Sequence, residues 1–122
     1  MQIADAEWRV MEVLWQSSPL TAAEIIAALA DVGWTAATVK TLLHRLTKKG
    51  AIGFEAEGKR YSYRPIVPRK ACVREVTRSL VDRVFGGEPL SLLEYFVKST
   101  KLSPEELQQL KRLVEEQEGK RP

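Results

Sequence analysis

The side chains with the clearest chemical potential lie in the segment from Trp34 to Gly50, WTAATVKTLLHRLTKKG. At helical spacing, its polar positions bring hydroxyl, imidazole and cationic groups to one face, and the segment contains no carboxylate. Hydroxyls can exchange hydrogen bonds with base edges, and cations can bind phosphates, so this face suits a groove of duplex DNA. Its members are Thr38, Lys40, Thr41, His44, Arg45 and Lys48.

The same segment has an apolar face that a core must hold. Four apolar residues recur at the i, i+3, i+4, i+7 spacing of a helix packed on one side. Thr35 is placed to cap the start of this helix, and two lysines followed by Gly50 are typical of a helix end. The pattern therefore predicts a helix between Thr35 and Gly50. The apolar residues are Val39, Leu42, Leu43 and Leu46.

Two helices are predicted before this segment. Apolar residues recur at helical spacing over 5–16, and Pro19 ends that helix. Thr21 and Glu24 match a capping box, which opens a second helix that we expect to end at Gly33. Only a few residues join the second helix to the third, so the pair predicts a helix-turn-helix.

An alternating pattern follows the three helices. Apolar and polar residues alternate over 52–57 and again over 60–64, with Gly58-Lys59 as the turn between them. Tyr61 and Tyr63 are expected on the buried face of this β-hairpin. Three helices followed by a hairpin form a winged helix, in which Lys59 and Arg60 would touch phosphates beside the groove.

The C-terminal half returns to helical patterns and predicts three further helices. Three helices of about fifty residues bury too little surface to be stable alone. The single cysteine, Cys72, cannot form an internal disulfide that would stabilise them. Two copies that pack their apolar stripes together would solve this problem. We therefore predict a mainly α fold with a small β-hairpin wing: a winged-helix DNA-binding domain over 1–66 and a helical dimerisation domain over 67–122. The dimerisation residues are Val73, Val76, Leu80, Val84, Leu92, Phe96, Leu107, Leu110 and Val114.

Charge and composition narrow the classes of function. The net charge is +3, but residues 1–33 hold one cation and five anions, whereas residues 34–66 hold seven cations and two anions. No apolar run approaches the roughly 20 residues that span a bilayer, so we expect a cytoplasmic protein without membrane insertion. One histidine and one cysteine, far apart in the sequence, offer no catalytic or metal-binding cluster. We expect no enzyme, metal or other cofactor.

A dimer of winged helices would present two third helices to an inverted repeat in double-stranded DNA. The sequence therefore predicts a homodimeric transcriptional repressor that acts by occupying its operator. The alternative is a winged-helix protein–protein interaction module without sequence-specific DNA binding. A mainly apolar outer face on the third helix would favour that alternative, and the cationic face disfavours it.

Several motifs together resemble the penicillinase-repressor family (the BlaI/MecI/CopY group) over nearly the whole chain. The resemblance implies a dimeric repressor of operators with TACA/TGTA-like half-sites, which controls a β-lactamase or a related cell-wall-stress gene in antibiotic resistance. The motifs are Ala6-Glu7-Trp8, Val10-Met11, Leu14-Trp15, Trp34-Thr35, Thr38-Val39-Lys40-Thr41-Leu42-Leu43, Arg45-Leu46, Lys48-Lys49-Gly50, Phe85-Gly86-Gly87 and Leu102-Ser103-Pro104-Glu105-Glu106.

The resemblance also implies roles for single residues. In the family, the residues at the positions of Thr38, Lys40 and Thr41 face bases. The residue at the position of Arg45, together with the wing, binds the DNA backbone. Ala37 replaces a lysine of some members, so its methyl could contact a thymine methyl instead. Base contacts are expected from Ala37, Thr38, Lys40, Thr41 and His44. Phosphate contacts are expected from Thr35, Arg45, Lys48, Lys49, Lys59 and Arg60.

The resemblance further bears on release from DNA. Classical members are inactivated by proteolysis at an Asn-Phe bond in the fifth helix, where this chain has Tyr95-Phe96. Tyr95-Phe96 is the corresponding candidate cleavage site, and a membrane sensor metalloprotease is the corresponding partner. The copper-responsive branch carries a C-terminal cysteine cluster that this chain lacks, so copper sensing by that route is not expected.

Overall fold

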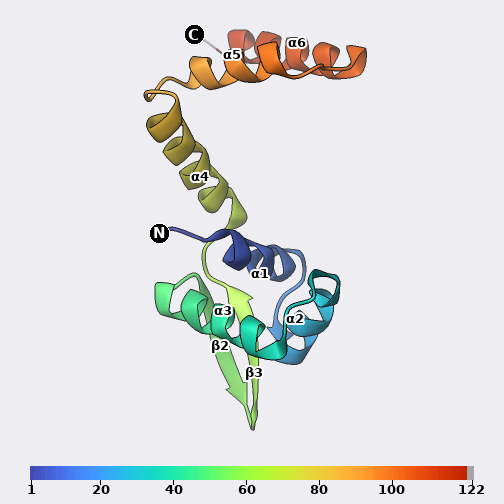
Figure 1. Ribbon diagram of the computed structural model, residues 1–122, viewed down its shortest axis with the longest axis vertical. Helices are drawn as coiled ribbons and strands as arrows, with labels where there is room; N and C mark the ends of the chain where they lie inside the picture. Colours follow the sequence, from blue (N-terminus) through green and yellow to red (C-terminus); the bar gives the residue numbers. More distant parts are fainter. Residues whose placement is uncertain (121–122) are drawn as a thin grey trace. The chain divides into compact units, whose positions relative to one another are not determined.

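The computed structural model describes residues 1–120, which form two compact units divided between Val76 and Thr77 (Figure 1). The predicted domain boundary after residue 66 precedes α4, whereas the division between the units lies inside that helix. The first unit contains α1 (Asp5–Gln16), β1 (Leu20–Thr21), α2 (Ala22–Ala28), the 3-10 helix η1 (Ala30–Val32), α3 (Ala36–Lys49), β2 (Ile52–Glu57) and β3 (Arg60–Pro65). The second unit is built from the end of α4 (Arg69–Val84), α5 (Pro89–Ser99) and α6 (Pro104–Gly119).

The local signals at the start and end of α3 act as predicted. The Thr35 hydroxyl accepts a hydrogen bond from the Thr38 N–H at 3.2 Å, which satisfies one of the unpaired donors of the first turn. Gly50 ends the helix with a φ of 80°, in the left-handed region that costs glycine little. The structure therefore confirms the helix that carries the cationic face.

The second helix is shorter than predicted. Its capping box is present, because the Glu24 N–H donates to the Thr21 hydroxyl and the Thr21 N–H donates to the Glu24 carboxylate. The helix ends at Ala28, and the chain then tightens into η1, which Gly33 ends with a φ of 82°. The prediction that Gly33 ends α2 is therefore wrong, because Gly33 ends η1.

The sheet has three antiparallel strands in the order β1-β3-β2. The hairpin of β2 and β3 is confirmed, with Phe54 opposite Tyr63 and Ala56 opposite Tyr61. The strand β1, which pairs with β3, was not predicted, because two residues are too short to show alternation.

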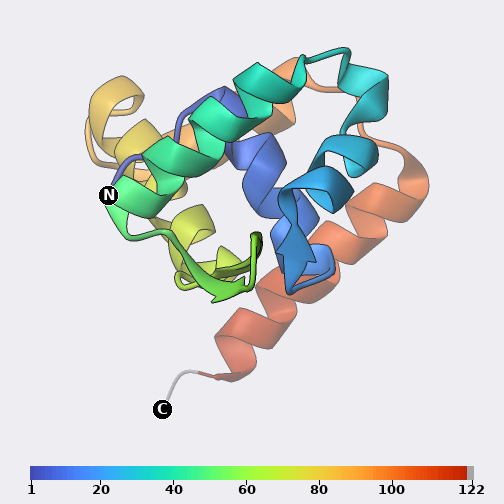
Figure 2. The ribbon, with the colours of Figure 1, turned by 90° about the horizontal axis from the view of Figure 1, so that it is seen from below.

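The core of the first unit lies where α1, α2 and α3 meet the start of β2. Figure 2 shows α3 crossing α1, with α2 beside it. The Trp15 indole donates to the Val67 carbonyl at 2.9 Å, which ties the chain after the wing back to α1. The residues of the buried cluster are Val10, Met11, Leu14, Ile25, Leu29, Val39, Leu42, Leu43, Leu46, Ala51 and Ile52.

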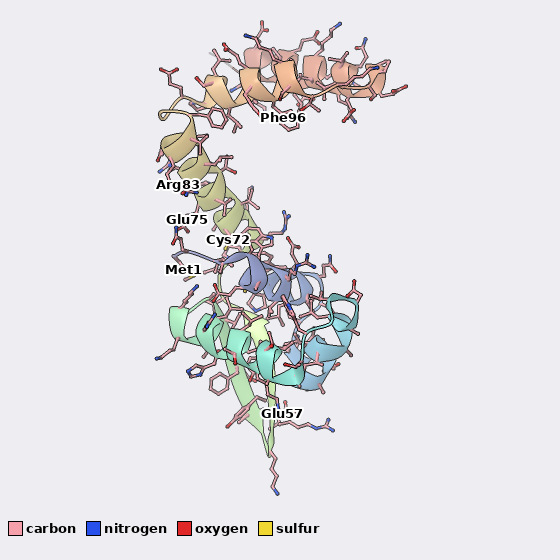
Figure 3. All side chains as sticks on the ribbon, in the orientation of Figure 1. Met1, Glu57, Cys72, Glu75, Arg83 and Phe96 are labelled. Carbon is pink, nitrogen blue, oxygen red and sulfur yellow. The ribbon has the colours of Figure 1, made fainter. Side chains whose placement is uncertain are left out.

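The second unit has little core of its own. Among its described residues, 77–120, Val81 is the only apolar side chain that is buried. Phe96 projects from α5 with 55% of its surface exposed, and Val114 of α6 is 52% exposed (Figure 3). No helix in the described part of the chain is long and apolar enough to cross a bilayer.

Candidate nucleic-acid interface

The outer face of α3 carries the side chains predicted to touch bases. The four apolar residues of the helix are buried. Because successive residues are rotated by about 100° around the helix axis, the residues on the opposite side face outward. The exposed side chains on that side and its flanks include all five predicted base contacts. They are Ala37, Thr38, Lys40, Thr41 and His44.

Two threonine hydroxyls on this face are already engaged within the protein. The Thr41 hydroxyl donates to the Ala37 carbonyl at 2.9 Å, and the Thr38 hydroxyl lies 3.0 Å from that of Thr35. The Thr41 oxygen is thereby left as an acceptor toward solvent, and its methyl group can touch apolar groups. An acceptor beside a methyl suits an amino group of adenine or cytosine next to a thymine methyl.

The two flanks of α3 face different neighbours. Lys40, His44 and Thr47 line the side toward the wing. Arg45 lies on the side toward α1, where its charge acts on the Glu7 carboxylate. Lys48 is exposed near the end of the helix. The cations of α3 therefore spread across the full width of its outer face.

The Lys49 ammonium makes hydrogen bonds within the protein. It donates to the Glu7 carboxylate and, at 2.8 Å, to the Gln2 carbonyl. Burial raises the pKa of Glu7, but hydrogen bonds from Lys49 and from the Ala4 N–H, with the charges of Lys49 and Arg45, lower it overall. The structure therefore places the Lys49 ammonium in this ion pair, and phosphate binding by Lys49 stays a prediction.

A hollow of about 940 Å³ separates α3 from the wing. The start of α2 closes one side of it, and the aromatic face of the hairpin forms another. The predicted phosphate contacts Lys59 and Arg60 lie on the wing side of this hollow. Glu57, which is labelled in Figure 3, lies near the wing tip. The structure thus brings the wing cations and the wing side of α3 around one concave surface.

The aromatic residues of this hollow correct one expectation. Tyr63 is half-buried, and burial, followed by the neighbouring Tyr61, raises its pKa. Tyr61 is 51% exposed and Phe54 is 48% exposed, because the hairpin extends beyond the core that covers Ile52. Alternation correctly placed these side chains on one face, but it does not indicate where the covering core ends.

The residues predicted for dimerisation and proteolysis lie on α4, α5 and α6. Leu92 and Leu110 are half-buried, and the others are exposed. Tyr95 and Phe96 lie within α5 and are both exposed. Within the described residues, no group of three or more histidine, cysteine or acidic side chains is placed to hold a metal. The exposed predicted dimerisation residues are Val73, Val76, Leu80, Val84, Phe96, Leu107 and Val114.

Comparisons with known proteins agree with this arrangement. A family model described as "Penicillinase repressor" matches residues 3–116. The chain is 32% identical over 121 residues to the penicillinase repressor of Bacillus licheniformis, over 98% of this chain and 94% of that protein. It is 29% identical over 114 residues to the methicillin resistance regulatory protein MecI of Staphylococcus aureus (strain N315), over 93% of each.

A solved structure extends the similarity to the fold. The Bacillus licheniformis BlaI monomeric form in complex with the blaP half-operator matches 57% of this chain and 87% of that chain, with a TM-score of 0.51 and 38% identity. The winged-helix arrangement predicted from the sequence is thereby confirmed. Sequence and fold lead to the same conclusion: the chain belongs to the penicillinase repressor family.

Proposed function

We propose that the chain is a transcriptional repressor that binds an inverted-repeat operator in double-stranded DNA as a homodimer. The observation that carries the proposal is the outer face of α3, which is exposed, cationic and free of carboxylates along its described length. A relative named as a repressor, a relative named as a regulatory protein, and a relative solved with a half-operator support the same function. A protein-binding module would need a mainly apolar face at this place.

The proposed contacts divide between sequence choice and affinity. Base edges would be read from the first half of the outer face and by His44. Phosphates would be bound from the flank of α3, from its two ends and from the wing, which fixes the register of the helix in the groove. The base contacts are Ala37, Thr38, Lys40, Thr41 and His44. The phosphate contacts are Thr35, Arg45, Lys48, Lys59 and Arg60.

The exposed apolar stripes support a dimer. Large apolar side chains left in water mark interaction surfaces, and α5 and α6 expose several of them. Pairing with a second copy would bury these stripes and set the spacing between the two α3 helices.

We infer the regulated target and the route of release from the family. A β-lactamase or a related cell-wall-stress gene is the proposed target, and a membrane sensor metalloprotease the proposed partner of a cytoplasmic repressor. The Tyr95-Phe96 bond lies inside α5, so cleavage there would require local opening of this helix.

The phosphate assignment is tested with Arg45→Ala. This change should weaken binding to selected and unrelated duplexes about equally, and it should lower the slope of log K against log salt by about one. The selected duplex is obtained from a random pool with the wild-type chain, and anisotropy titrations from 50 to 200 mM salt give the slope. Arg9→Ala, which removes an exposed cation of α1, is the control and should leave the slope unchanged. An unchanged slope for Arg45→Ala would contradict the assignment.

The base assignment is tested with Lys40→Ala. Loss of a base contact should reduce the ratio of affinities for selected and shuffled duplexes about tenfold, since one good contact discriminates by about 1–3 kcal/mol. The same titrations at a single salt concentration give this ratio for wild type and variant. Wild-type chain that binds both duplexes equally would overturn the proposed function itself, in favour of the protein-binding module.

A further inference from the structure

The wing presents an aromatic face that is only partly covered by the described residues. This face begins in the core with the buried Ile52 and continues along the hairpin to the exposed Phe54 and Tyr61. The two exposed rings pack edge to face with centroids 5.1 Å apart, and the centroid of the Phe54 ring lies 6.1 Å from that of the Tyr63 ring. Two large apolar side chains held together in water indicate a surface that is covered when the protein functions.

The aromatic face forms the apolar side of the hollow between α3 and the wing. Cationic or imidazole groups surround it, from Lys40 and His44 on one side and from Lys59 and Arg60 on the other. Glu24 is the only carboxylate among the residues that line the hollow, and the Thr21 N–H already donates to it. The occupant of this hollow must therefore be anionic at its edges and apolar where it meets the rings.

A sugar–phosphate strand has both properties, because anionic phosphates flank each deoxyribose, whose C–H groups form an apolar surface. We propose that the hollow holds one backbone strand of the operator, an inference that rests on the proposed function. The deoxyriboses pack on Phe54 and Tyr61, and the flanking phosphates lie toward Lys59 and Arg60. Charge complementarity selects this occupant over an apolar segment of another protein, which would leave the surrounding cations unpaired.

The two kinds of contact differ in their dependence on salt. Each neutralised phosphate releases counterions and adds to the slope of log K against log salt. Ring–sugar contacts involve no ions, so their contribution to affinity is the same at every salt concentration. The proposal therefore assigns to Phe54 and Tyr61 a part of the operator affinity that salt does not weaken.

The test compares three variants on the duplex selected by the wild-type chain. Phe54→Thr combined with Tyr61→Thr, which keeps β-branched residues in the strands, should weaken binding about tenfold at every salt concentration, as expected from the lost apolar burial. Tyr61→Phe keeps the ring and should bind within about twofold of wild type. Arg60→Ala should instead lower the salt slope by about one.

A matched single variant separates lost contacts from an unfolded wing. Tyr61→Thr leaves the Phe54–Tyr63 contact intact and should lose about threefold with an unchanged slope. Wild-type affinity in the double variant would overturn the proposal, as would a changed slope. A loss of affinity in Tyr61→Phe as large as that in Tyr61→Thr would overturn it too, because the hydroxyl and not the ring would then make the contact. Each of these outcomes is read on DNA that the wild type binds, so it differs from a failure of the proposed function.

Discussion

The double substitution Phe96→Asp and Val114→Asp is expected to convert the proposed homodimer into monomers and to weaken binding to a full inverted repeat about 100-fold or more. Phe96 and Val114 are 55% and 52% exposed, so a carboxylate at either place stays hydrated in the single chain. In a dimer that covers these stripes, the same carboxylates would be buried without a partner. The substitutions should therefore act through association, on which the second unit depends because it has little core of its own.

Sedimentation and half-site binding distinguish this explanation from others. Wild type should sediment as a dimer and the double variant as a monomer, and any loss of helical circular dichroism should not exceed the contribution of the second unit. Affinity for a single half-site should be retained, because α3 and the wing are unaltered, whereas the gain from linking two half-sites is lost. The control Gln108→Asp places the same charge at an exposed polar position of α6 and should remain dimeric. A dimeric mass for the double variant would contradict the assignment of these stripes.

The sequence predicted α3 well because independent signals coincide there. Thr35, the apolar spacing and Gly50 each mark the same helix, and the burial of one face exposes the other without further information. Local signals were misleading where the chain changes conformation within a few residues. Gly33 does have the expected positive φ, but it ends η1 rather than α2, and β1 is too short to leave a pattern.

The remaining differences come from contacts between distant residues. Lys49 precedes Gly50 as a helix-ending cation should, and nothing in its neighbourhood indicates a carboxylate 42 positions away. Alternation placed Tyr61 on the apolar face of the wing, but only the structure shows that the hairpin extends past its cover. The candidate site was thus predictable on α3, where helix geometry decides exposure. It was not predictable where tertiary contacts decide which side chains are free.

The ion pair between Lys49 and Glu7 should contribute strongly to the free energy of unfolding. The Glu7 side chain is 2% exposed, and its Oε1 accepts from the Ala4 N–H at 2.8 Å and from Lys49. Within the described residues, its Oε2 is buried without a hydrogen-bond partner. Lys49→Met should lower the free energy of unfolding at pH 7 by about 2 kcal/mol, below the 3–5 kcal/mol of fully buried pairs because Lys49 is 36% exposed.

The dependence on pH tests the electrostatic cause. In the wild type the folded-state pKa of Glu7 is lowered, so its contribution to stability is present above the ordinary glutamate pKa of about 4.3 and is lost as the pH falls through the folded value. In Lys49→Met the hydrogen bond and charge of Lys49 are gone and burial remains, which should raise the pKa of Glu7. Protonation then relieves the buried charge, so the penalty of Lys49→Met should shrink as the pH falls from 7 toward 4.

Urea unfolding of wild type, Lys49→Met, Glu7→Gln and the double variant at several pH values measures this effect. Glu7→Gln keeps an acceptor for the Ala4 N–H but carries no charge, so adding Lys49→Met to it should cost less at pH 7 than adding Lys49→Met to the wild type. That difference should shrink as the pH falls toward 4, because Glu7 of Lys49→Met takes up its proton at a higher pH than Glu7 of the wild type. A penalty that is the same at pH 7 and pH 4 would instead mean that the Lys49 stem stabilises the end of α3 by packing, and that the charge of Glu7 contributes nothing.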